Sequence, residues 1–136
     1  MREIKFRAWD YDDKKMWKVV AISESIWGDC EEKHIRVCDF DKSPSLKETD
    51  VRLSVNYKLM QYTGLKDKNG REIYEGDVLF HPIQGRRKVY YPFAEHVASY
   101  GLRNVENGMA GDLCDSQIYE IIGNLYENPE LLEVNK

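Results

Sequence analysis

The sequence predicts a mainly β protein. Three features of its 136 residues lead to this expectation. Short apolar segments alternate with polar residues along much of the chain, which is typical of half-buried strands. Turn signals that contain glycine separate these segments, because Asn and Gly adopt positive φ at low energetic cost. One of these turns leads directly into a short apolar run, which is how the strands of small β-barrels turn corners.

The glycine turns are concentrated in residues 59–80, which we call the signature stretch. Residues 67–70 (Asp-Lys-Asn-Gly) are the strongest turn signal, and Gly64 precedes them. Residues 75–77 (Glu-Gly-Asp) form a second reversal before the apolar residues 78–80. Polar side chains on such turns usually cap backbone groups. We therefore expect this stretch to build the corners of a sheet.

The first segment of the chain predicts a β-hairpin. Ile4, Phe6 and Ala8 alternate with basic and aromatic residues, so we expect these three side chains to face inward. Lys5 and Arg7 then fall on the opposite face, where we expect solvent, since charge commonly protects an edge strand. A polar turn and a second run of β-forming residues complete the hairpin.

The middle of the chain carries one strong strand signal. Ile35 and Val37 indicate a short strand, and residues 39–50 are polar and predict a loop. Apolar and polar residues then alternate from Val51 to Leu59, which is the clearest strand pattern in the chain. Because this strand leads directly into the signature stretch, we place the boundary between two regions here.

The last third of the chain predicts further turns and strands. Residues 81–85 predict a turn that leads into an aromatic strand. Residues 104–116 are rich in Gly, Asn and acids and predict a loop, and residues 118–122 predict the last strand. Asn128, followed by proline and an acid, predicts the start of a short helical turn.

Three parts of the chain resemble the YopX family, a group of small proteins encoded by phages and prophages. The signature stretch resembles the family's signature, residues 5–10 (Lys-Phe-Arg-Ala-Trp-Asp) resemble its opening strand, and residues 121–132 resemble its closing segment. The resemblance implies a phage origin and a C-terminal half similar to an SH3-type barrel, but no particular activity. It also favours strands over a helix at residues 92–101, where Phe93, Val97 and Tyr100 lie at helical spacing.

The predicted architecture is an N-terminal β-hairpin region with a variable loop, residues 1–55, joined to a C-terminal SH3-like barrel, residues 56–136. The net charge of −4 argues against broad binding to phosphate backbones, but a local basic face stays open. No apolar run approaches the roughly 20 residues that a membrane helix needs, and the N-terminus lacks the apolar core of a signal peptide. The odd number of cysteines, three, then predicts reduced thiols in the cytoplasm of a host cell.

A metal site is the first candidate chemistry. Cys30, His34 and Cys38 are spaced four residues apart, so on a helix they would share one face and could bind zinc. The spacing matches none of the usual zinc patterns, and a fourth ligand would have to come from a distant residue such as Cys114. We therefore expect no metal and no other cofactor.

A nucleic-acid site is the second candidate. The cations Arg86, Arg87 and Lys88 directly precede Tyr90 and Tyr91, so cations could hold phosphates while rings stack on bases. The alternative is a charged strand end with aromatic side chains that face inward, and the acidic net charge favours this alternative.

Acids and histidines are the third candidate. Glu72, Glu75 and Asp77 cluster at the second turn of the signature stretch, where paired carboxylates could act as acid and base or hold a cation. Turn acids are more often caps. His81 and His96 have no Ser, Cys or Asp partner at a motif spacing. We therefore expect no enzyme.

Aromatic residues are the last candidate, for protein interaction. They make up 12% of the chain, and Tyr and Trp are favoured at interfaces. Trp9, Trp17, Tyr62 and Tyr74 are the residues that we single out, although each fits a core position equally well and burial decides. The sequence thus predicts a non-catalytic binding module that engages a host or phage protein, with a homodimer as a possible state. The alternative is a small β-barrel that binds single-stranded nucleic acid.

Overall fold

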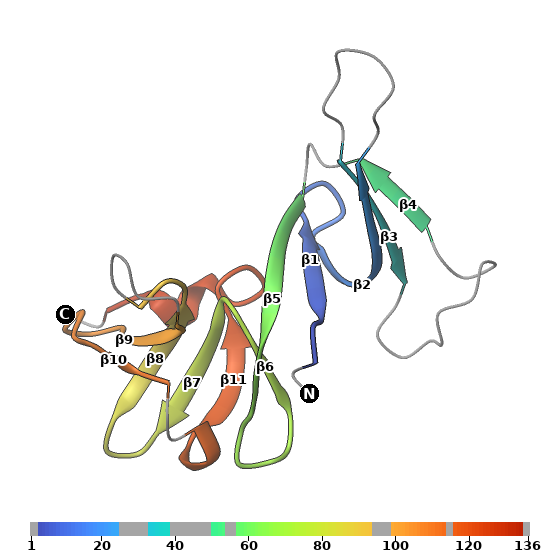
Figure 1. Cartoon of the computed structure of the whole chain (residues 1–136). Coiled ribbons are helices and arrows are strands. Elements are labelled where there is room, and N and C mark those ends of the chain that lie inside the picture. The colour runs from blue at the N-terminus through green and yellow to red at the C-terminus, as the bar shows by residue number, and fades with distance from the viewer. Residues whose placement is uncertain are drawn as a thin grey trace. The chain divides into compact units, whose positions relative to one another are not determined.

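The computed structural model describes residues 3–24, 33–38, 50–53, 57–93, 99–113 and 116–134 (Figure 1). Its strand registers are antiparallel, and the mainly β prediction is confirmed. The elements are β1 (Phe6–Asp10), β2 (Lys15–Glu24), β3 (Lys33–Cys38), β4 (Asp50–Leu53), β5 (Tyr57–Lys66), β6 (Glu72–Tyr74), β7 (Asp77–His81), β8 (Gly85–Tyr90), β9 (Gly101–Asn104), β10 (Ala110–Asp112) and β11 (Glu120–Asn124), with the 3-10 helices η2 (Ser116–Ile118) and η3 (Pro129–Leu132).

The chain forms two compact units, which we describe separately. Lys5–Met60 is the N-terminal unit, and Gln61–Lys136 together with Met1–Ile4 is the C-terminal unit. Strand β5 begins in the first unit and ends in the second. The positions of strands in the N-terminal unit follow the order β4-β3-β2-β1-β5.

The predicted N-terminal hairpin is confirmed. Strands β1 and β2 pair antiparallel, with Ala8 opposite Trp17. These two side chains and Val37 of β3 are buried together as the core of this unit, and Tyr57 and Leu59 pack against them. Alternation along each strand brings these side chains to one face, because successive strand residues point to opposite sides.

The predicted faces of β1 are partly wrong. Ile4, expected inside, is 70% exposed, and Arg7, expected in solvent, is only 7% exposed. Ile4 lies before the first residue of β1, so the strand does not orient it. Strand β1 is also an inner strand, between β2 and β5, so the expectation of a charged edge strand does not apply to it. Residues 7–10 are all buried, which shows that both faces of β1 are covered.

The predicted single strand at residues 51–59 is wrong as well. Residues 50–53 belong to β4, which pairs with β3, whereas β5 begins at Tyr57 and follows β1 in the sheet order. The sequence alternates through both strands, and a hydrophobic period of two carries no sign of where one strand ends. Of the predicted loop at residues 39–50, residues 39–49 lie outside the described residues, and Asp50 belongs to β4.

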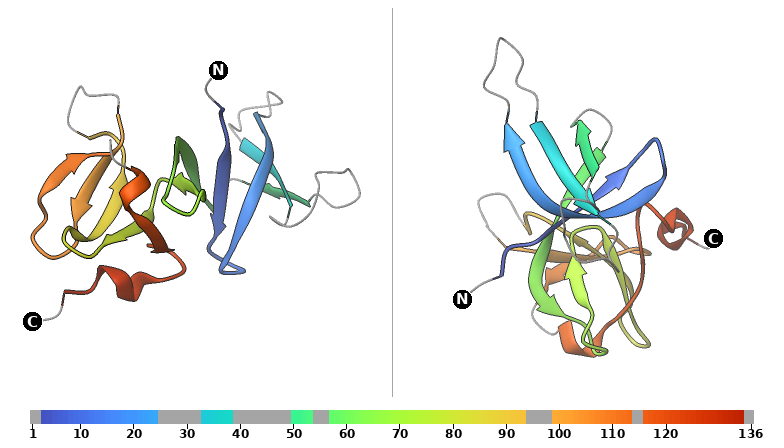
Figure 2. Two further views of the ribbon diagram at one scale, coloured as in Figure 1. Left: turned by 90° about the horizontal axis from the view of Figure 1, so that it is seen from below. Right: turned by 90° about the vertical axis from the view of Figure 1, so that its right-hand side faces the viewer.

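The C-terminal unit contains a five-stranded sheet in the order β10-β9-β8-β7-β11. Its core consists of apolar residues from this sheet, from β6 and from the positions directly after β10 and directly before β11, namely Ile73, Leu79, Val89, Leu102, Leu113, Tyr119 and Ile121. In the described residues β10 and β11 are the two ends of the strand order, so closure into an SH3-type barrel stays a prediction. After β11 the chain ends with η3 at the surface of this unit (Figure 2).

The signature stretch forms the corners that the sequence predicted. Residues 67–70 turn between β5 and β6, and Gly70 has φ +80°. Gly76, with φ +84°, makes the second corner between β6 and β7. Its N–H donates to Val89 O at 2.9 Å, and its carbonyl accepts from Leu125 N–H at 2.9 Å. This corner is therefore hydrogen-bonded to β8 through Val89 and to the segment after β11 through Leu125.

Gly70 offers a clean test of the conformational argument. A Cβ at this position would have nothing within 4 Å, so a substitution meets only the backbone preference. We expect Gly70→Ala to lower the free energy of unfolding by about 1 kcal/mol, because left-handed backbone costs a β-carbon roughly that much. Gly70→Asn should cost less, since Asn tolerates this conformation. Equal losses for both variants in denaturant unfolding would contradict the argument.

Several C-terminal predictions need correction. Residues 104–116 were expected to be a loop, but they contain β10, which pairs with β9. The last strand is β11, two residues later than predicted at its start, because η2 occupies Ser116–Ile118. In residues 92–101, positions 94–98 lie outside the described residues and β9 starts at Gly101.

The helical turn at the C-terminus is confirmed as η3, with proline at its start. Asn128 stands at the N-cap position, yet its side chain makes no cap hydrogen bond. Its Oδ1 atom instead accepts from Asn124 N–H at 3.3 Å. The local cap signal located the helix correctly, and a contact back to β11 redirected the side chain.

Candidate functional site

Asp67 ties the signature stretch to the last strand. Its Oδ1 atom accepts from the backbone N–H groups of Asn69 and Arg71, each at 2.9 Å. Its Oδ2 atom accepts from Ile121 N–H of β11 at 3.0 Å. Lys68 N–H also donates to Tyr119 O at 2.9 Å. A single buried carboxylate thus closes its own turn and anchors the turn to β11.

The electrostatics of Asp67 follow from these contacts. Burial on its own would raise the pKa of the carboxyl group, because the charged form loses water. The N–H donors of Ile121, Arg71 and Asn69, together with the Arg71 guanidinium, outweigh burial, and the pKa is lowered. A carboxylate that is ionised and fully engaged in this way is unsuited to act as a general acid or base near neutral pH.

The other polar residues of the signature stretch also cap backbone groups. Glu75 Oε1 accepts from Gln61 N–H at 2.9 Å, and Asp77 Oδ2 accepts from Tyr74 N–H at 2.8 Å. Thr63 Oγ1 donates to Ile73 O at 2.8 Å and accepts from Leu65 N–H at 3.2 Å. The expectation that turn acids are caps is confirmed for Glu75 and Asp77. Within the described residues no cluster of three metal-ligating side chains occurs.

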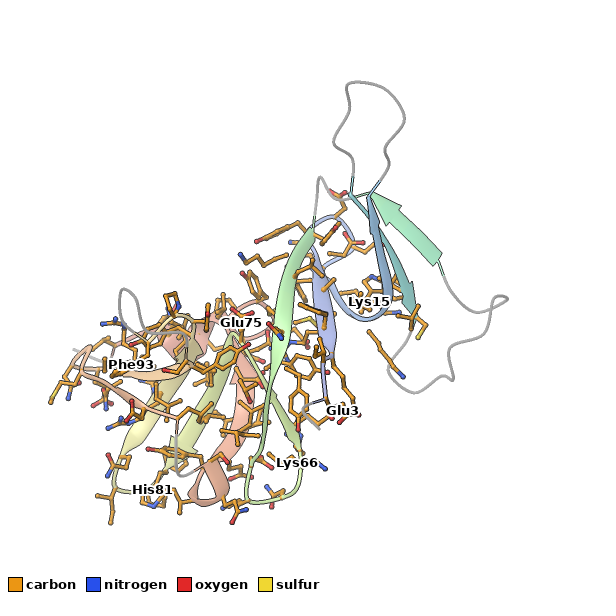
Figure 3. All side chains as sticks on the ribbon, in the orientation of Figure 1. Glu3, Lys15, Lys66, Glu75, His81 and Phe93 are labelled. Carbon is orange, nitrogen blue, oxygen red and sulfur yellow. The ribbon has the colours of Figure 1, made fainter. Side chains whose placement is uncertain are left out.

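A shallow depression lies beside this turn. It has a volume of about 560 Å³ and is lined by Gly64, Leu65, Lys66, Asp67, Lys68, Gly70, Ser116 and Gln117. We call it the turn depression. Lys66 and His81 lie at the same end of the C-terminal unit, whereas Phe93 lies toward the other (Figure 3). The turn depression therefore belongs to the end where the β5–β6 turn, η2 and the β7–β8 turn are found.

The turn depression presents a mixed surface. Leu65 is an exposed apolar side chain in its lining, and Ile118 of η2 is exposed directly after Gln117. Lys66 and Lys68 are exposed beside them, and Lys68 Nζ lies 3.7 Å from Glu120 Oε2. Asp67, the one acid among the described residues of the lining, has both oxygens engaged by backbone donors. The surface can thus offer apolar contact and positive charge to a ligand.

The aromatic candidates for protein interaction lie elsewhere. Trp9, Trp17, Tyr62 and Tyr74 are all buried. Tyr62 and Tyr74 are cross-strand partners in β5 and β6, and their ring centroids are 5.6 Å apart. Trp17 belongs to the N-terminal core, with Lys15 Nζ 4.0 Å from its ring centroid. Their burial favours the alternative that these four residues belong to the core.

The basic residues of β8 are divided between two faces of the sheet. Val89 is buried, so Arg87 shares the inner face with it, and Arg86 and Lys88 share the outer face. Arg87 Nη2 donates to Gln84 Oε1 at 2.8 Å. Arg86 donates through Nη1 to Leu131 O at 2.8 Å and through Nη2 to Glu133 O at 2.9 Å. These two arginines are therefore engaged in the fold.

Two of the remaining candidates, Lys88 and Tyr90, share the outer face of β8 with Arg103 of β9. Lys88 lies directly opposite Arg103, and Tyr90 lies opposite Gly101. The Arg103 guanidinium carbon is 4.9 Å from the Tyr90 ring centroid. We call Lys88, Tyr90 and Arg103 the basic-aromatic face. Tyr91 follows the strand, is 49% exposed, and packs on Tyr100, which lies against the core on the other face.

The remaining candidates have structural roles or lie outside the described residues. His81 Nδ1 accepts from Ile83 N–H at 3.1 Å and from Gln84 N–H at 3.2 Å, so His81 caps the β7–β8 turn. Cys38 is a buried thiol. Cys30, His96 and Cys114 are not in the described residues, and the side chain of His34 is not described.

Two functional candidates escaped sequence reasoning. Gln117 reaches the turn depression from η2, about 50 residues beyond the signature turn. Arg103 joins the basic-aromatic face through the register of β8 and β9. The sequence alone does not show either placement, because Gln117 and Arg103 reach these surfaces only when strands and turns that are distant in sequence become neighbours.

These features define a small antiparallel β protein whose glycine turns are bonded to its last strand. The chain belongs to the YopX protein family, whose model matches residues 5–133. Its structure is similar to the crystal structure of protein EF1440 from Enterococcus faecalis, with 28% sequence identity, a TM-score of 0.60, and coverage of 98% of this chain and 100% of that chain. It also resembles the crystal structure of yopX from Bacillus subtilis, with 20% identity, a TM-score of 0.51, and coverage of 97% and 98%.

The likeness to the Bacillus subtilis protein shows the common fold alone. No curated protein is a significant match to this chain. Among the described residues, none of the helices has the length and apolar character required to cross a membrane.

Proposed function

We propose that this protein is a non-catalytic binding module of phage origin that engages a host or phage protein through the turn depression in the host cytoplasm. The observation that carries the proposal is the commitment of Asp67. Among the described residues of the lining, Asp67 is the one acid, and both of its carboxylate oxygens are bonded to backbone N–H groups, so it is engaged in holding the surface together. What remains for a ligand is shape, apolar contact and positive charge.

The composition of the lining supports a protein ligand. Leu65 in the lining and Ile118 directly after the lining residue Gln117 offer exposed apolar contact, and Lys66 and Lys68 are exposed cations of the lining. An apolar centre with a polar rim is the usual anatomy of a protein interface. A shallow, open surface also suits an extended protein segment better than a small molecule, which is normally enclosed over most of its surface. The ligand that fits is a segment with an apolar side chain flanked by acids.

Photo-crosslinking in cells tests this proposal. A photoreactive phenylalanine analogue replaces Leu65 in the full chain, which is expressed in a phage-infected bacterial host. The matched control places the analogue at Met109, which is exposed on the β9–β10 turn outside the depression. We expect a discrete adduct with one protein from position 65 and none from position 109.

The specificity of that adduct is checked with a charge variant. Changing Lys66 and Lys68 to Glu in the same chain should abolish the adduct, because like charges repel an acidic segment. Identical adducts from both probe positions would contradict the proposal. An adduct with a second copy of this chain would replace a host or phage partner with a homodimer.

A further inference from the structure

The β5–β6 turn carries a residue pair that can modify itself chemically. Asn69 and Gly70 are both exposed at this turn, and Gly70 has φ +80°. In an Asn-Gly pair the backbone nitrogen of glycine can attack the side-chain amide of asparagine, because glycine has no β-carbon that would shield its nitrogen. A Cβ at Gly70 would have nothing within 4 Å, so no neighbour closes the space beside it either.

A second Asn-Gly pair in the C-terminal unit allows a direct comparison. Asn107 and Gly108 are also exposed, Gly108 has φ +72°, and a Cβ there would likewise have nothing within 4 Å. Both glycine nitrogens donate one hydrogen bond, Gly70 N–H to Asp67 O at 3.0 Å and Gly108 N–H to Asn104 O at 2.9 Å. This bond has to open before attack in either turn, so it slows both pairs alike.

The two asparagine side chains differ in their contacts. Asn107 Oδ1 accepts from Met109 N–H at 2.9 Å, which fixes the plane of its amide group. In the part of the chain that the structure describes, the side chain of Asn69 forms no hydrogen bond, and only its backbone N–H is bonded. Its amide can therefore turn its carbon atom toward Gly70 N without losing a contact, as the arrangement of the reacting atoms before attack requires.

We propose that Asn69 is a site of spontaneous covalent modification, where the chain converts asparagine to aspartate and isoaspartate. Gly70 N loses its proton to hydroxide and attacks Asn69 Cγ. A bond forms between these two atoms, and the side-chain nitrogen takes up a proton from water and leaves as ammonia. Water then opens the resulting cyclic imide. Cleavage of the new bond gives aspartate, whereas cleavage of the original peptide bond gives isoaspartate, in which the chain runs through the side chain of residue 69.

Either product changes the turn depression, a consequence that rests on the proposed function. Lys68 and Gly70, the two neighbours of Asn69, both line the depression. A new carboxylate between them opposes the acidic segment that the exposed lysines are proposed to attract. Isoaspartate also adds a methylene group to the backbone between two N–H groups that both bond to Asp67, those of residues 69 and 70. The affinity of the turn depression for its partner should therefore fall as the protein ages.

Peptide mapping of the purified full chain tests the proposal. The folded chain is incubated in mildly alkaline buffer, mass spectrometry follows the exchange of the side-chain NH₂ group for OH at both asparagines, and an isoaspartate methyltransferase labels isoaspartate. We expect Asn69 to convert about fivefold faster than Asn107, since only Asn107 has to give up a side-chain hydrogen bond. In concentrated urea, which removes that bond, the two residues should convert at similar rates.

Met109→Pro is the matched variant, because proline lacks the N–H group that holds Asn107. In this variant we expect Asn107 to convert about fivefold faster than in the parent chain, while Asn69 keeps its rate. Mapping reads only the covalent change, so its result does not depend on whether the proposed function is correct. Equal rates in the folded parent chain, faster conversion of Asn107, or an intact Asn69 after the unfolded chain has fully converted would overturn the proposal.

Asn69→Asp tests the effect on binding separately, because it supplies the charge of the product in a homogeneous protein. It should lower the yield of the photo-crosslinked adduct from position 65, since the added carboxylate repels an acidic segment. An unchanged yield of that adduct would overturn the effect on binding.

Discussion

We expect Asp67→Ala to lower the free energy of unfolding by about 3–5 kcal/mol, because three backbone donors lose their acceptor and each buried donor without a partner costs about 1–3 kcal/mol. The donors belong to Asn69, Arg71 and Ile121, and the carboxylate is only 3% exposed. Denaturant unfolding followed by tryptophan fluorescence measures the loss.

Asp67→Asn is the matched variant, because it keeps the shape of the side chain. An amide can retain the acceptor for Asn69 and Arg71 but must turn an NH₂ group toward Ile121 N–H. We expect a smaller loss, about 2 kcal/mol, from this one lost hydrogen bond. Losses below 0.5 kcal/mol for both variants would show that the carboxylate does not hold the turn, since surface substitutions stay within about this range.

The same carboxylate predicts how stability depends on pH. The pKa of Asp67 is lowered in the folded chain, so the unfolded chain binds the proton more readily. Asp67 therefore contributes its full share to the free energy of unfolding at pH values above its pKa in the unfolded chain, about 3.9. This contribution is lost as the pH falls through the lowered pKa of Asp67 in the folded chain. The difference in stability between the parent chain and Asp67→Asn should shrink on acidification from pH about 6 to below 3. A constant difference would contradict the lowered pKa.

Replacing Arg86 with alanine is expected to lower the free energy of unfolding by about 2 kcal/mol, since charge-assisted hydrogen bonds contribute more than neutral ones. The Arg86 guanidinium holds two carbonyls of the C-terminal segment, those of Leu131 and Glu133. The sequence suggested nucleic-acid binding for this residue, and its contacts give it a structural role. Chemical denaturation of the variant measures the effect.

A double-mutant cycle separates the effect of these two hydrogen bonds from other effects of Arg86. The partner variant is a chain that ends after Asn128 and so lacks both carbonyl acceptors. If the two hydrogen bonds account for the lost stability, Arg86→Ala should lower the free energy of unfolding of the shortened chain by less than half as much, because the effects of interacting groups are not additive. If Arg86→Ala lowers the free energy of unfolding equally in the full and the shortened chain, Arg86 stabilises the fold through its aliphatic side chain and not through these hydrogen bonds.

The corners of the fold could be predicted because they are local. Gly70 and Gly76 adopt the positive φ that their turn sequences indicate. Asp77 accepts from the N–H group of Tyr74, three residues earlier, as turn acids usually do. These features depend on a few consecutive residues, and their preferences act before any long-range contact forms. The bond from Gln61 N–H to Glu75 is different, because 14 residues of sequence separate the two.

The faces of the strands were harder to predict because they depend on neighbours. Arg7 is buried although it lies on the face of β1 opposite Ala8, so both faces of this strand are covered, and one of the flanking strands, β5, lies far from β1 in the sequence. The sequence pattern likewise did not show that β4 and β5 are separate strands, because their different partners lie elsewhere in the sequence. Alternation reveals that a segment is half-buried, but not which strands will flank it.

The candidate sites show the same division. The sequence located Lys88 and Tyr90, but it joined them to Arg87, which the alternation of β8 directs to the inner face, and to Tyr91, which packs on Tyr100 beside the core. It could not supply Arg103, because that residue reaches the face only through the register of β8 with β9. The turn depression likewise needs η2 to approach the signature turn.

Amide hydrogen exchange at Ile121 tests most directly whether Asp67 anchors the signature turn to the last strand. The account predicts strong protection of Ile121 N–H in the parent chain and rapid exchange in Asp67→Asn, while the Gly76 amide, which donates to Val89 O, stays protected in both. Rapid exchange at Ile121 in the parent chain, or protection that the substitution leaves unchanged, would contradict it.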